Sequence, residues 1–124
     1  MDLVTLFSAL ADRTRLRILN LIRRREVCVC YFVEILGETQ PKISRHLAYL
    51  RRAGLVRTRR DGKWIHYSLE HPSDPSVRQV LEATLDAVAS EKEMRRDEAA
   101  LESACCATTL PPELEHAPRP QLTT

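Results

Sequence analysis

The sequence lacks any long hydrophobic run. None of its apolar stretches approaches the ~20 residues that a membrane-spanning helix needs, so we expect no membrane partner. The first residues, MDLVTLFSALADRTRLR, have an acid at position 2 and no basic segment ahead of the apolar residues, which is unlike a secretion signal. We therefore expect a cytoplasmic protein, in which cysteine thiols stay reduced.

Catalytic signatures are also missing. The sequence contains no glycine-rich phosphate loop, no HExxH zinc motif, no nucleophile elbow and no internal repeat. With 124 residues, of which 44% are hydrophobic, the chain has room for one domain with a modest core. These absences favour a small binding protein and not an enzyme.

Charge is unevenly distributed, although the formal net charge is only +2. Positions 42–63 hold eight basic side chains and one acidic side chain, whereas positions 82–115 hold nine acidic and three basic ones. Any single arginine of the basic segment is explained equally well as part of a solvated face. The cluster as a whole favours a polyanion, and above all a nucleic acid, as the partner of one face.

Four helices are predicted in the first half of the chain. Their expected ranges are about 2–11, 13–24, 31–36 and 40–53. Asp12 is a good N-cap for the second helix, Gly37 stops the third, and Pro41 suits the first turn of the fourth. A short β-branched segment, EVCVC, precedes the third helix and carries two of the four cysteines.

Two strands are predicted after the fourth helix. Asp61-Gly62 is a strong signal for a two-residue type I′ turn, and it separates strands over Leu55–Arg60 and Lys63–Leu69. Two short helices joined by a turn, with basic residues on the second, fit a helix-turn-helix, and the basic hairpin makes it winged. The sequence therefore predicts a mainly α fold with a β-hairpin, a winged helix-turn-helix of order α-α-α-α-β-β-α.

The remaining chain divides into a helix and an extension. A last long helix begins at Pro75, and its regular apolar pattern weakens after Glu91. From Pro111 the tail is rich in proline and is expected to be disordered. We therefore expect a winged helix-turn-helix domain over residues 1–92 and an extension with a cysteine pair over residues 93–124.

The basic side chains of the fourth helix and the hairpin tip are candidates for DNA contacts. The N-terminal half of a recognition helix enters the major groove, where arginine and lysine bond guanine edges, and other polar side chains reach phosphates. The candidates on the helix are Lys42, Ser44, Arg45 and His46, and those at the hairpin tip include Arg59, Arg60 and Lys63.

The cysteines form two pairs, Cys28 with Cys30 and Cys105 with Cys106. Thiolates select soft ions, and the second pair lies in a polar segment that builds no core. Cys28 and Cys30 converge only if the chain around Val29 is not yet helical. Simpler interpretations are a buried Cys28, an idle tail pair, or a strained disulfide between the adjacent tail cysteines. A thiol-redox regulator is a further alternative.

Two long segments resemble one family. FSALADRTRLRILNLIRRREVCVC and QPKISRHLAYLRRAGLVRTRRDGKWIHYSL together resemble the ArsR/SmtB family of bacterial metal-sensing repressors, over about residues 3–88. The resemblance implies a homodimer that is joined through its first and last helices. It also implies that the dimer binds operator DNA, which we expect to be an inverted repeat, and that it leaves the operator when a metal binds. It also implies operator contacts at Gln40, Lys42, Ser44, Arg45 and His46, and in the wing from Arg59 to Lys63.

The ligand set departs from the patterns of the family. Arsenic sensors are similar in their Cys-Val-Cys, but Val33 stands where they carry a third cysteine. The N-terminal cysteines of cadmium and lead sensors are absent, and so are the histidines of zinc and nickel sensors on the last helix. A few arsenic-responsive relatives are similar in carrying a cysteine pair near the C-terminus.

The resemblance thus implies trivalent arsenic, as arsenite or methylarsenite, as the inducer. Its expected ligands are the thiolates of Cys28, Cys30, Cys105 and Cys106. Inorganic trivalent arsenic takes three thiolates when it can, whereas a methylated arsenical has only two open positions. Either one thiol of the first pair joins the second pair, or each pair acts alone. A cadmium or lead sensor remains an alternative.

Overall fold

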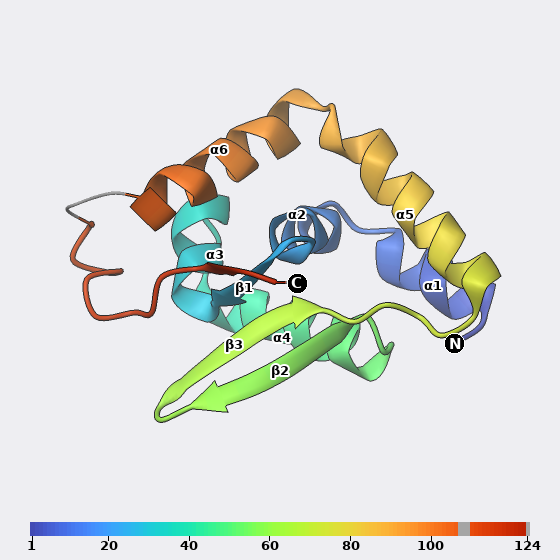
Figure 1. The fold of residues 1–124 in the computed structure, drawn as a ribbon, viewed down its shortest axis with the longest axis horizontal. Helices are drawn as coiled ribbons and strands as arrows, with labels where there is room; N and C mark the ends of the chain where they lie inside the picture. Colours follow the sequence, from blue (N-terminus) through green and yellow to red (C-terminus); the bar gives the residue numbers. More distant parts are fainter. Residues whose placement is uncertain (107–109, 124) are drawn as a thin grey trace.

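The chain folds as a winged helix with additions. The computed structural model describes residues 1–106 and 110–123, and these form six helices and four strands (Figure 1). In order they are α1 (Leu3–Leu10), α2 (Arg13–Ile22), β1 (Arg25–Cys28), α3 (Val29–Leu36), α4 (Gln40–Arg52), β2 (Val56–Asp61), β3 (Trp64–Leu69), α5 (Pro75–Ala89), α6 (Lys92–Cys106) and β4 (Gln121–Leu122). The predicted series of four helices, a hairpin and a helix is confirmed. The structure adds β1, α6 and β4 to it.

Local capping residues set the helix ends. The Asp12 carboxylate accepts a hydrogen bond from the backbone N–H of Arg15 at 3.0 Å, which starts α2. Thr39 caps α4 in the same way, with Pro41 in the first turn. Gly37 ends α3 with a φ of 69°, a left-handed conformation that glycine adopts without strain. The predicted helix ends are therefore correct to within a few residues.

The hairpin turn lies one residue beyond its predicted position. Asp61 pairs with Trp64, so the two central residues of the turn are Gly62 and Lys63 and not Asp61 and Gly62. Gly62 has a φ of 61°, and among the described residues only glycines have positive φ. A type I′ turn needs positive φ at both central residues, so that assignment is wrong as well.

The four strands form one sheet in the order β2-β3-β1-β4. Strand β1 pairs antiparallel with β3 on one side, with Cys28 opposite His66, and with β4 on the other side. The segment just before the third helix is therefore part of the same sheet as the wing. This pairing joins the first cysteine pair to the hairpin.

The described part of the tail packs against the rest of the chain. Residues 110–123 form turns and then β4, and Leu114 and Ala117 are buried in the same cluster as the main core. The backbone N–H of Thr123 donates to the carbonyl of Arg24 at 2.9 Å, which continues the pairing of β4 with β1. The end of α6 and the edge of β1 supply a surface that the tail sequence alone does not reveal.

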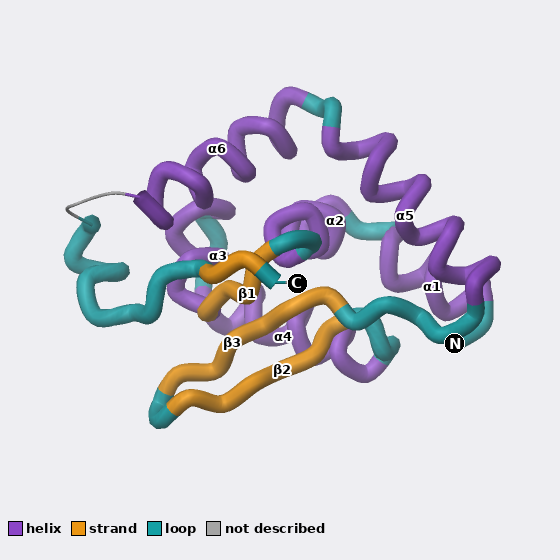
Figure 2. Tube along the Cα trace, viewed as in Figure 1, coloured by secondary structure: helices purple, strands orange, loops and turns teal. Residues whose placement is uncertain are grey.

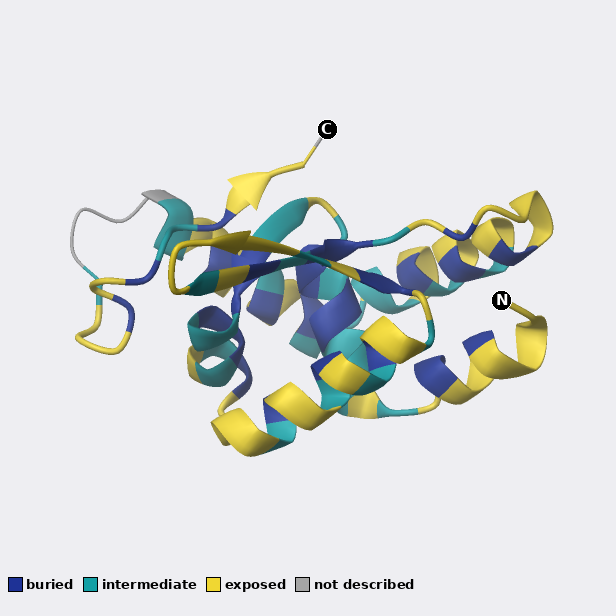
Figure 3. Cartoon of the chain, turned by 90° about the horizontal axis from the view of Figure 1, so that it is seen from below, coloured by how far each residue is buried: buried dark blue, intermediate teal, exposed yellow. Residues whose placement is uncertain are grey.

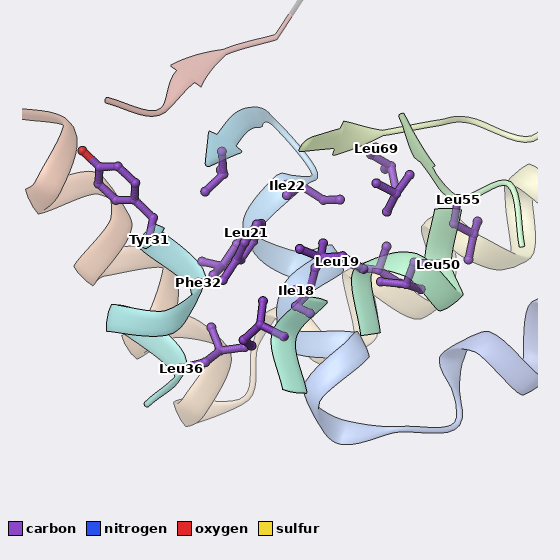
Figure 4. Packing of buried hydrophobic residues seen from close by; sticks show 14 of the residues in the cluster. Ile18, Leu19, Leu21, Ile22, Tyr31, Phe32, Leu36, Leu50, Leu55 and Leu69 are labelled. Atoms are coloured by element: carbon purple, nitrogen blue, oxygen red, sulfur yellow. The ribbon is translucent and has the colours of Figure 1, made fainter. Parts of the chain in front are cut away.

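Helix α2 lies at the centre of the core. Its residues Ile18, Leu19, Leu21 and Ile22 pack between α3 on one side and α4 with the hairpin on the other (Figure 4). The helical spacing of Ile43, Leu47 and Leu50 predicts an inward stripe on α4, and all three residues are buried. The core therefore fixes the orientation of α4 relative to the rest of the protein.

Helix α6 packs across α2 and α3. Its buried Asp97 accepts two hydrogen bonds from Arg17 of α2, at 2.8 and 2.9 Å, and Met94 and Leu101 are buried on the same side. The end of α6 is thereby brought to the start of α3. Within the described ranges, no helix has both the length and the apolar character needed to cross a bilayer.

Candidate DNA-binding surface and thiol site

Three of the predicted DNA-contacting side chains are exposed on the outer face of α4. Gln40, Ser44 and Arg45 face solvent because Ile43 and Leu47 turn the opposite face of the helix into the core. Figure 3 shows this division, with the exposed face of α4 in yellow and its buried side in dark blue. All three residues lie in the N-terminal half of the helix, the half that inserts into a major groove.

Two other predicted contacts on α4 are engaged within the protein. The ammonium of Lys42 lies 3.2 Å from the Glu38 carboxylate, one helical turn away. The Nε2 atom of His46 lies 3.8 Å from the carboxylate of Asp12, and its side chain is only 17% exposed. Burial lowers the pKa of His46, so its ring is neutral at physiological pH. His46 therefore lies at the contact between α4 and α2, whereas Lys42 stays half-exposed.

Sequence reasoning missed Arg15, which braces α4. Its Nε donates to the carbonyl of Ala9 at 2.7 Å, and its Nη2 donates to the carbonyl of Ser8 at 3.0 Å. The same guanidinium lies 4.3 Å from the centroid of the Tyr49 ring. Arg15 thus joins the end of α1 to Tyr49 on α4. No local sequence signal predicts this contact.

The wing presents two exposed basic side chains near its tip. Arg60 and Lys63 face solvent, and the hairpin of β2 and β3 extends past the helical body (Figure 2). The Nε of Arg60 donates to the carbonyl of Gly62 at 3.2 Å, and the ammonium of Lys63 lies 5.2 Å from the Trp64 ring. Both charges are therefore exposed at the tip of the hairpin.

Arg59, the third predicted wing residue, is half-exposed and is paired with a carboxylate of the same chain. Its Nε and Nη2 donate to the carboxylate of Glu26 on β1, with distances of 2.7 to 3.1 Å. This bidentate pair lowers the pKa of Glu26, so its carboxylate is ionised at neutral pH. The pair ties the wing to the strand that leads into the first cysteine pair.

Cys28 and Cys30 flank the junction of β1 and α3. Cys28 is the extended N-cap of α3, with φ −80° and ψ 154°, and Cys30 lies in the first helical turn. The chain is therefore extended at Cys28 but already helical at Val29. Burial, with the neighbouring Cys30 thiol as the second cause, raises the pKa of Cys28 to about 11. A soft ion must therefore displace a proton from Cys28 in order to bind there.

His66 lies against the first cysteine pair. Its Nδ1 is 3.5 Å from Sγ of Cys28 and 3.9 Å from the carboxylate of Glu26. The ring is buried, and its Nε2 has no hydrogen-bond partner among the described residues. The pairing of β1 with β3 brings His66 to the thiol, and no local sequence signal encodes this pairing.

Cys105 lies beneath the C-terminal tail. Its thiol donates to the carbonyl of Pro120 at 3.2 Å, and Nη1 of Arg25 donates to its sulfur at 3.2 Å. Arg119 donates to the backbone carbonyl of Cys105 at 3.3 Å. Cys106 ends α6, and its side chain lies outside the described part of the structure. The tail therefore closes over the end of α6 next to β1.

The described residues do not form a ready-made metal site. Within residues 1–106 and 110–123, no three cysteine, histidine or acidic side chains are grouped closely enough to hold an ion together. Cys28, Cys30 and Cys105 nevertheless supply soft sulfur donors at neighbouring ends of β1, α3 and α6. The donor chemistry fits a soft ion, and the described residues gather no set of four ligands for a zinc site.

The same features occur in a known family. A family model described as "Bacterial regulatory protein, arsR family" matches residues 12–58, which run from the cap of α2 into β2. The "Arsenic resistance transcriptional regulator ArsR2" of Pseudomonas putida is 47% identical over 83 residues, covering 65% of this chain and 71% of that protein. The chain belongs to the ArsR family. The ArsR-family match includes Cys28, Cys30 and all of α4.

Two further ArsR-like proteins define how far the similarity extends. The "Arsenic resistance transcriptional regulator ArsR1" of P. putida is 49% identical over 83 residues, covering 65% of this chain and 64% of that protein. The chain thus spans just under two thirds of that relative. The solved structure of HlyU from Vibrio cholerae superposes with a TM-score of 0.61 and 32% identity, covering 70% of this chain and 91% of that one. The winged helix-turn-helix is confirmed, and part of this chain has no counterpart in HlyU.

Proposed function

We propose that this ArsR-family protein is a transcriptional repressor that leaves its operator when trivalent arsenic binds cysteine thiolates. The observation that carries the proposal is the place of the first cysteine pair. It lies on the strand that pairs with the wing and at the start of the helix that precedes the recognition helix. Because operator DNA lies in the bacterial cytoplasm, the proposal puts the protein there too, as a regulator and not an enzyme.

The DNA contacts come from two elements in this proposal. Ser44 and Arg45 read base edges from the exposed half of α4, together with Gln40, and Lys42 reaches phosphate. Arg60 and Lys63 contact the backbone or minor groove from the wing tip, and Arg59 joins them if it exchanges Glu26 for a phosphate. His46 orients α4 and reaches DNA only if it leaves Asp12.

A two-fold dimer completes the operator-binding unit. Helices α1 and α5 pack together at one end of the molecule (Figure 1), and α1 exposes the large apolar side chains Leu3, Val4 and Phe7. Exposed apolar side chains gathered on one helix favour association with a second copy. Two copies related by a two-fold axis would present their recognition helices ~34 Å apart, which matches an inverted repeat.

The switch requires that the inducer favours the conformation that does not bind DNA. A ligand between the thiols would pull on the β1–α3 junction, and from there on α4 through α3 and on the wing through β3. Differential binding of ~1–3 kcal/mol is typical of such coupling between sites. The positions of the thiols allow one ligand to act on both DNA-contacting elements at once.

Arsenic is proposed over other ions on the chemistry of the donors. Trivalent arsenic binds two or three thiolates, whereas zinc prefers four ligands, which the described residues do not gather. A pair of thiols can bind either inorganic or methylated arsenic. Cadmium and lead stay alternatives because these two ions also bind thiolates strongly. A thiol-redox regulator uses the same cysteines without any ion.

Operator release, measured by fluorescence anisotropy, tests the proposal. We expect arsenite or methylarsenite to dissociate the complex and zinc to do so poorly. A variant with all four cysteines replaced by serine should keep its operator affinity and lose the response. If that variant is still released by arsenite, the thiolate switch is wrong. Release by peroxide in the absence of arsenic, or by cadmium or lead instead of arsenic, would identify one of the alternatives.

Single substitutions locate the site. Loss of response in Cys30→Ser and also in Cys105→Ser, with DNA binding retained, would support one site shared between α3 and α6. Loss only in Cys105→Ser and Cys106→Ser would move the site to the C-terminal pair.

A further inference from the structure

The hydroxyl of Tyr31 is buried without a hydrogen-bond partner. Tyr31 follows Cys30 in the first turn of α3 and is 0% exposed. No described residue accepts or donates a hydrogen bond at its hydroxyl oxygen. In Figure 4 the ring points away from the aliphatic residues of α2 and toward α6. An unpaired buried hydroxyl lowers stability, so its position calls for a partner that is absent from the protein alone.

The thiols lie on the elements around Tyr31. Cys30 directly precedes Tyr31 on α3, and Cys28 ends β1, the strand that leads into α3. Helix α6, toward which the ring points, packs against α3 and ends at Cys105 and Cys106. The hydroxyl is therefore a buried hydrogen-bond donor beside the elements that carry both cysteine pairs.

A second buried donor lies beside Cys105. The Nε of Arg25 has no hydrogen-bond partner among the described residues, although Nη1 of the same guanidinium donates to the sulfur of Cys105. The unpaired donors of Tyr31 and Arg25 thus lie on α3 and β1, the two elements that carry the first cysteine pair. Donors in this arrangement suit a ligand that offers an oxygen acceptor, and an apolar ligand would leave them unpaired.

We propose that the Tyr31 hydroxyl donates a hydrogen bond to the oxygen that inorganic trivalent arsenic keeps when two thiols of this chain hold it. The inference rests on the proposed function and adds a preference for inorganic over methylated arsenic. Arsenous acid, As(OH)₃, reacts with two thiols to form two As–S bonds and break two As–O bonds. The two hydroxyls leave as water with the thiol protons, arsenic stays trivalent, and one As–OH group remains as an acceptor.

Methylated trivalent arsenic leaves no such acceptor. When CH₃As(OH)₂ reacts with two thiols, both hydroxyls leave as water and only a methyl group remains on the bound arsenic. The hydroxyl of Tyr31 then stays unpaired. Val33 stands one helical turn after Cys30, so α3 offers no third thiol to the first pair, and two thiols hold the arsenic wherever either pair acts alone.

Tyr31→Phe separates the two arsenicals, because it removes the hydroxyl and keeps the ring. Binding of arsenite and of methylarsenite to the whole protein would be titrated by the ultraviolet absorbance of the As–S bonds. Urea unfolding of the arsenic-free protein would be measured in parallel. We expect arsenite to bind about tenfold more weakly, the effect of one hydrogen bond, and methylarsenite to bind as before. The arsenic-free variant should be as stable as the parent or more stable.

A second tyrosine provides the matched control. Tyr67 packs edge-on against Phe32 with ring centroids 6.3 Å apart, and it lies on β3. Tyr67→Phe should leave the binding of both arsenicals unchanged. Equal weakening of both arsenicals by Tyr31→Phe, or no change in either, would overturn the inference. So would a clear loss of stability without arsenic, because the hydroxyl would then have a partner in the free protein.

The experiment also distinguishes this inference from the proposed function. If the parent protein binds neither arsenical, the proposed function is wrong, and the inference goes with it. If the parent binds both, and Tyr31→Phe does not discriminate between them, only the role of Tyr31 is wrong.

Discussion

Replacing Asp97 with asparagine should destabilise the protein by about 3 kcal/mol, because it breaks a buried ion pair. The side chain of Asp97 is 3% exposed and that of Arg17 is 16% exposed, and two hydrogen bonds of 2.8 and 2.9 Å join them. Removing one partner of a buried pair costs roughly 3–5 kcal/mol, because the other charge is left unpaired. We expect a loss at the lower end of this range, because Arg17 is partly exposed and its Nη1 also lies 3.8 Å from the carboxylate of Glu93.

The free energy of unfolding in urea, followed by far-ultraviolet circular dichroism, measures this loss. The matched control is Glu91→Gln, which breaks a pair with Arg13 of 2.7 Å whose side chains are 41% and 54% exposed. Such a surface pair contributes only ~0–1 kcal/mol. If Asp97→Asn costs no more than this control, the pair is solvated, and α6 is not anchored on α2 in the way described. A cost of about 3 kcal/mol would support the docking that brings Cys105 to the start of α3.

Three further outcomes follow from the same structure. Arg45→Ala should weaken specific operator binding by ~1–3 kcal/mol in a gel-shift titration and leave the salt dependence similar, and unchanged binding would remove Arg45 from the interface. Lys63→Ala should weaken all DNA sequences alike and reduce the slope of log K against log salt by ~0.9, whereas a sequence-dependent loss would mean base contact. The pKa of His46 lies below its ordinary value of 6.5, so the unfolded state binds its proton more tightly. The contribution of His46 to stability is therefore complete above pH 6.5 and is lost as the pH falls toward the folded pKa, and His46→Gln should flatten the unfolding free energy over that window.

The elements that the sequence predicted correctly are those with local signals. Asp12, Gly37 and Pro41 mark helix ends through interactions with their own neighbours in the chain. The stripe of Ile43, Leu47 and Leu50 follows from helical spacing alone. These features need no knowledge of the rest of the fold, and the recognition helix was predicted for that reason.

The features that were missed depend on residues far apart in the chain. Burial of Leu114 needs the surface built by the end of α6, and a proline-rich tail has no periodicity that would reveal it. The contact between Cys28 and His66 needs the pairing of β1 with β3, and the turn at Gly62 differs from the prediction by one position of register. The ring of Tyr31 points toward α6 because α6 packs beside α3 (Figure 4). Such contacts follow from tertiary packing, which the local pattern does not specify.

In the proposed complex with DNA, Glu26 would compete with a phosphate for the guanidinium of Arg59. The donors of Arg59 that would reach a phosphate are the two nitrogens that already bind the Glu26 carboxylate. A phosphate would bind Arg59 only by displacing the Glu26 carboxylate. The affinity of the wing for DNA would therefore be lower than it would be with Arg59 unpaired. Coupling between two sites typically changes the affinity for a ligand by about 5- to 150-fold. A change of that size releases a DNA complex of moderate affinity more completely than a very tight complex. Glu26 lies two residues before Cys28, so a movement of β1 alters this internal competition as well as the helix that follows.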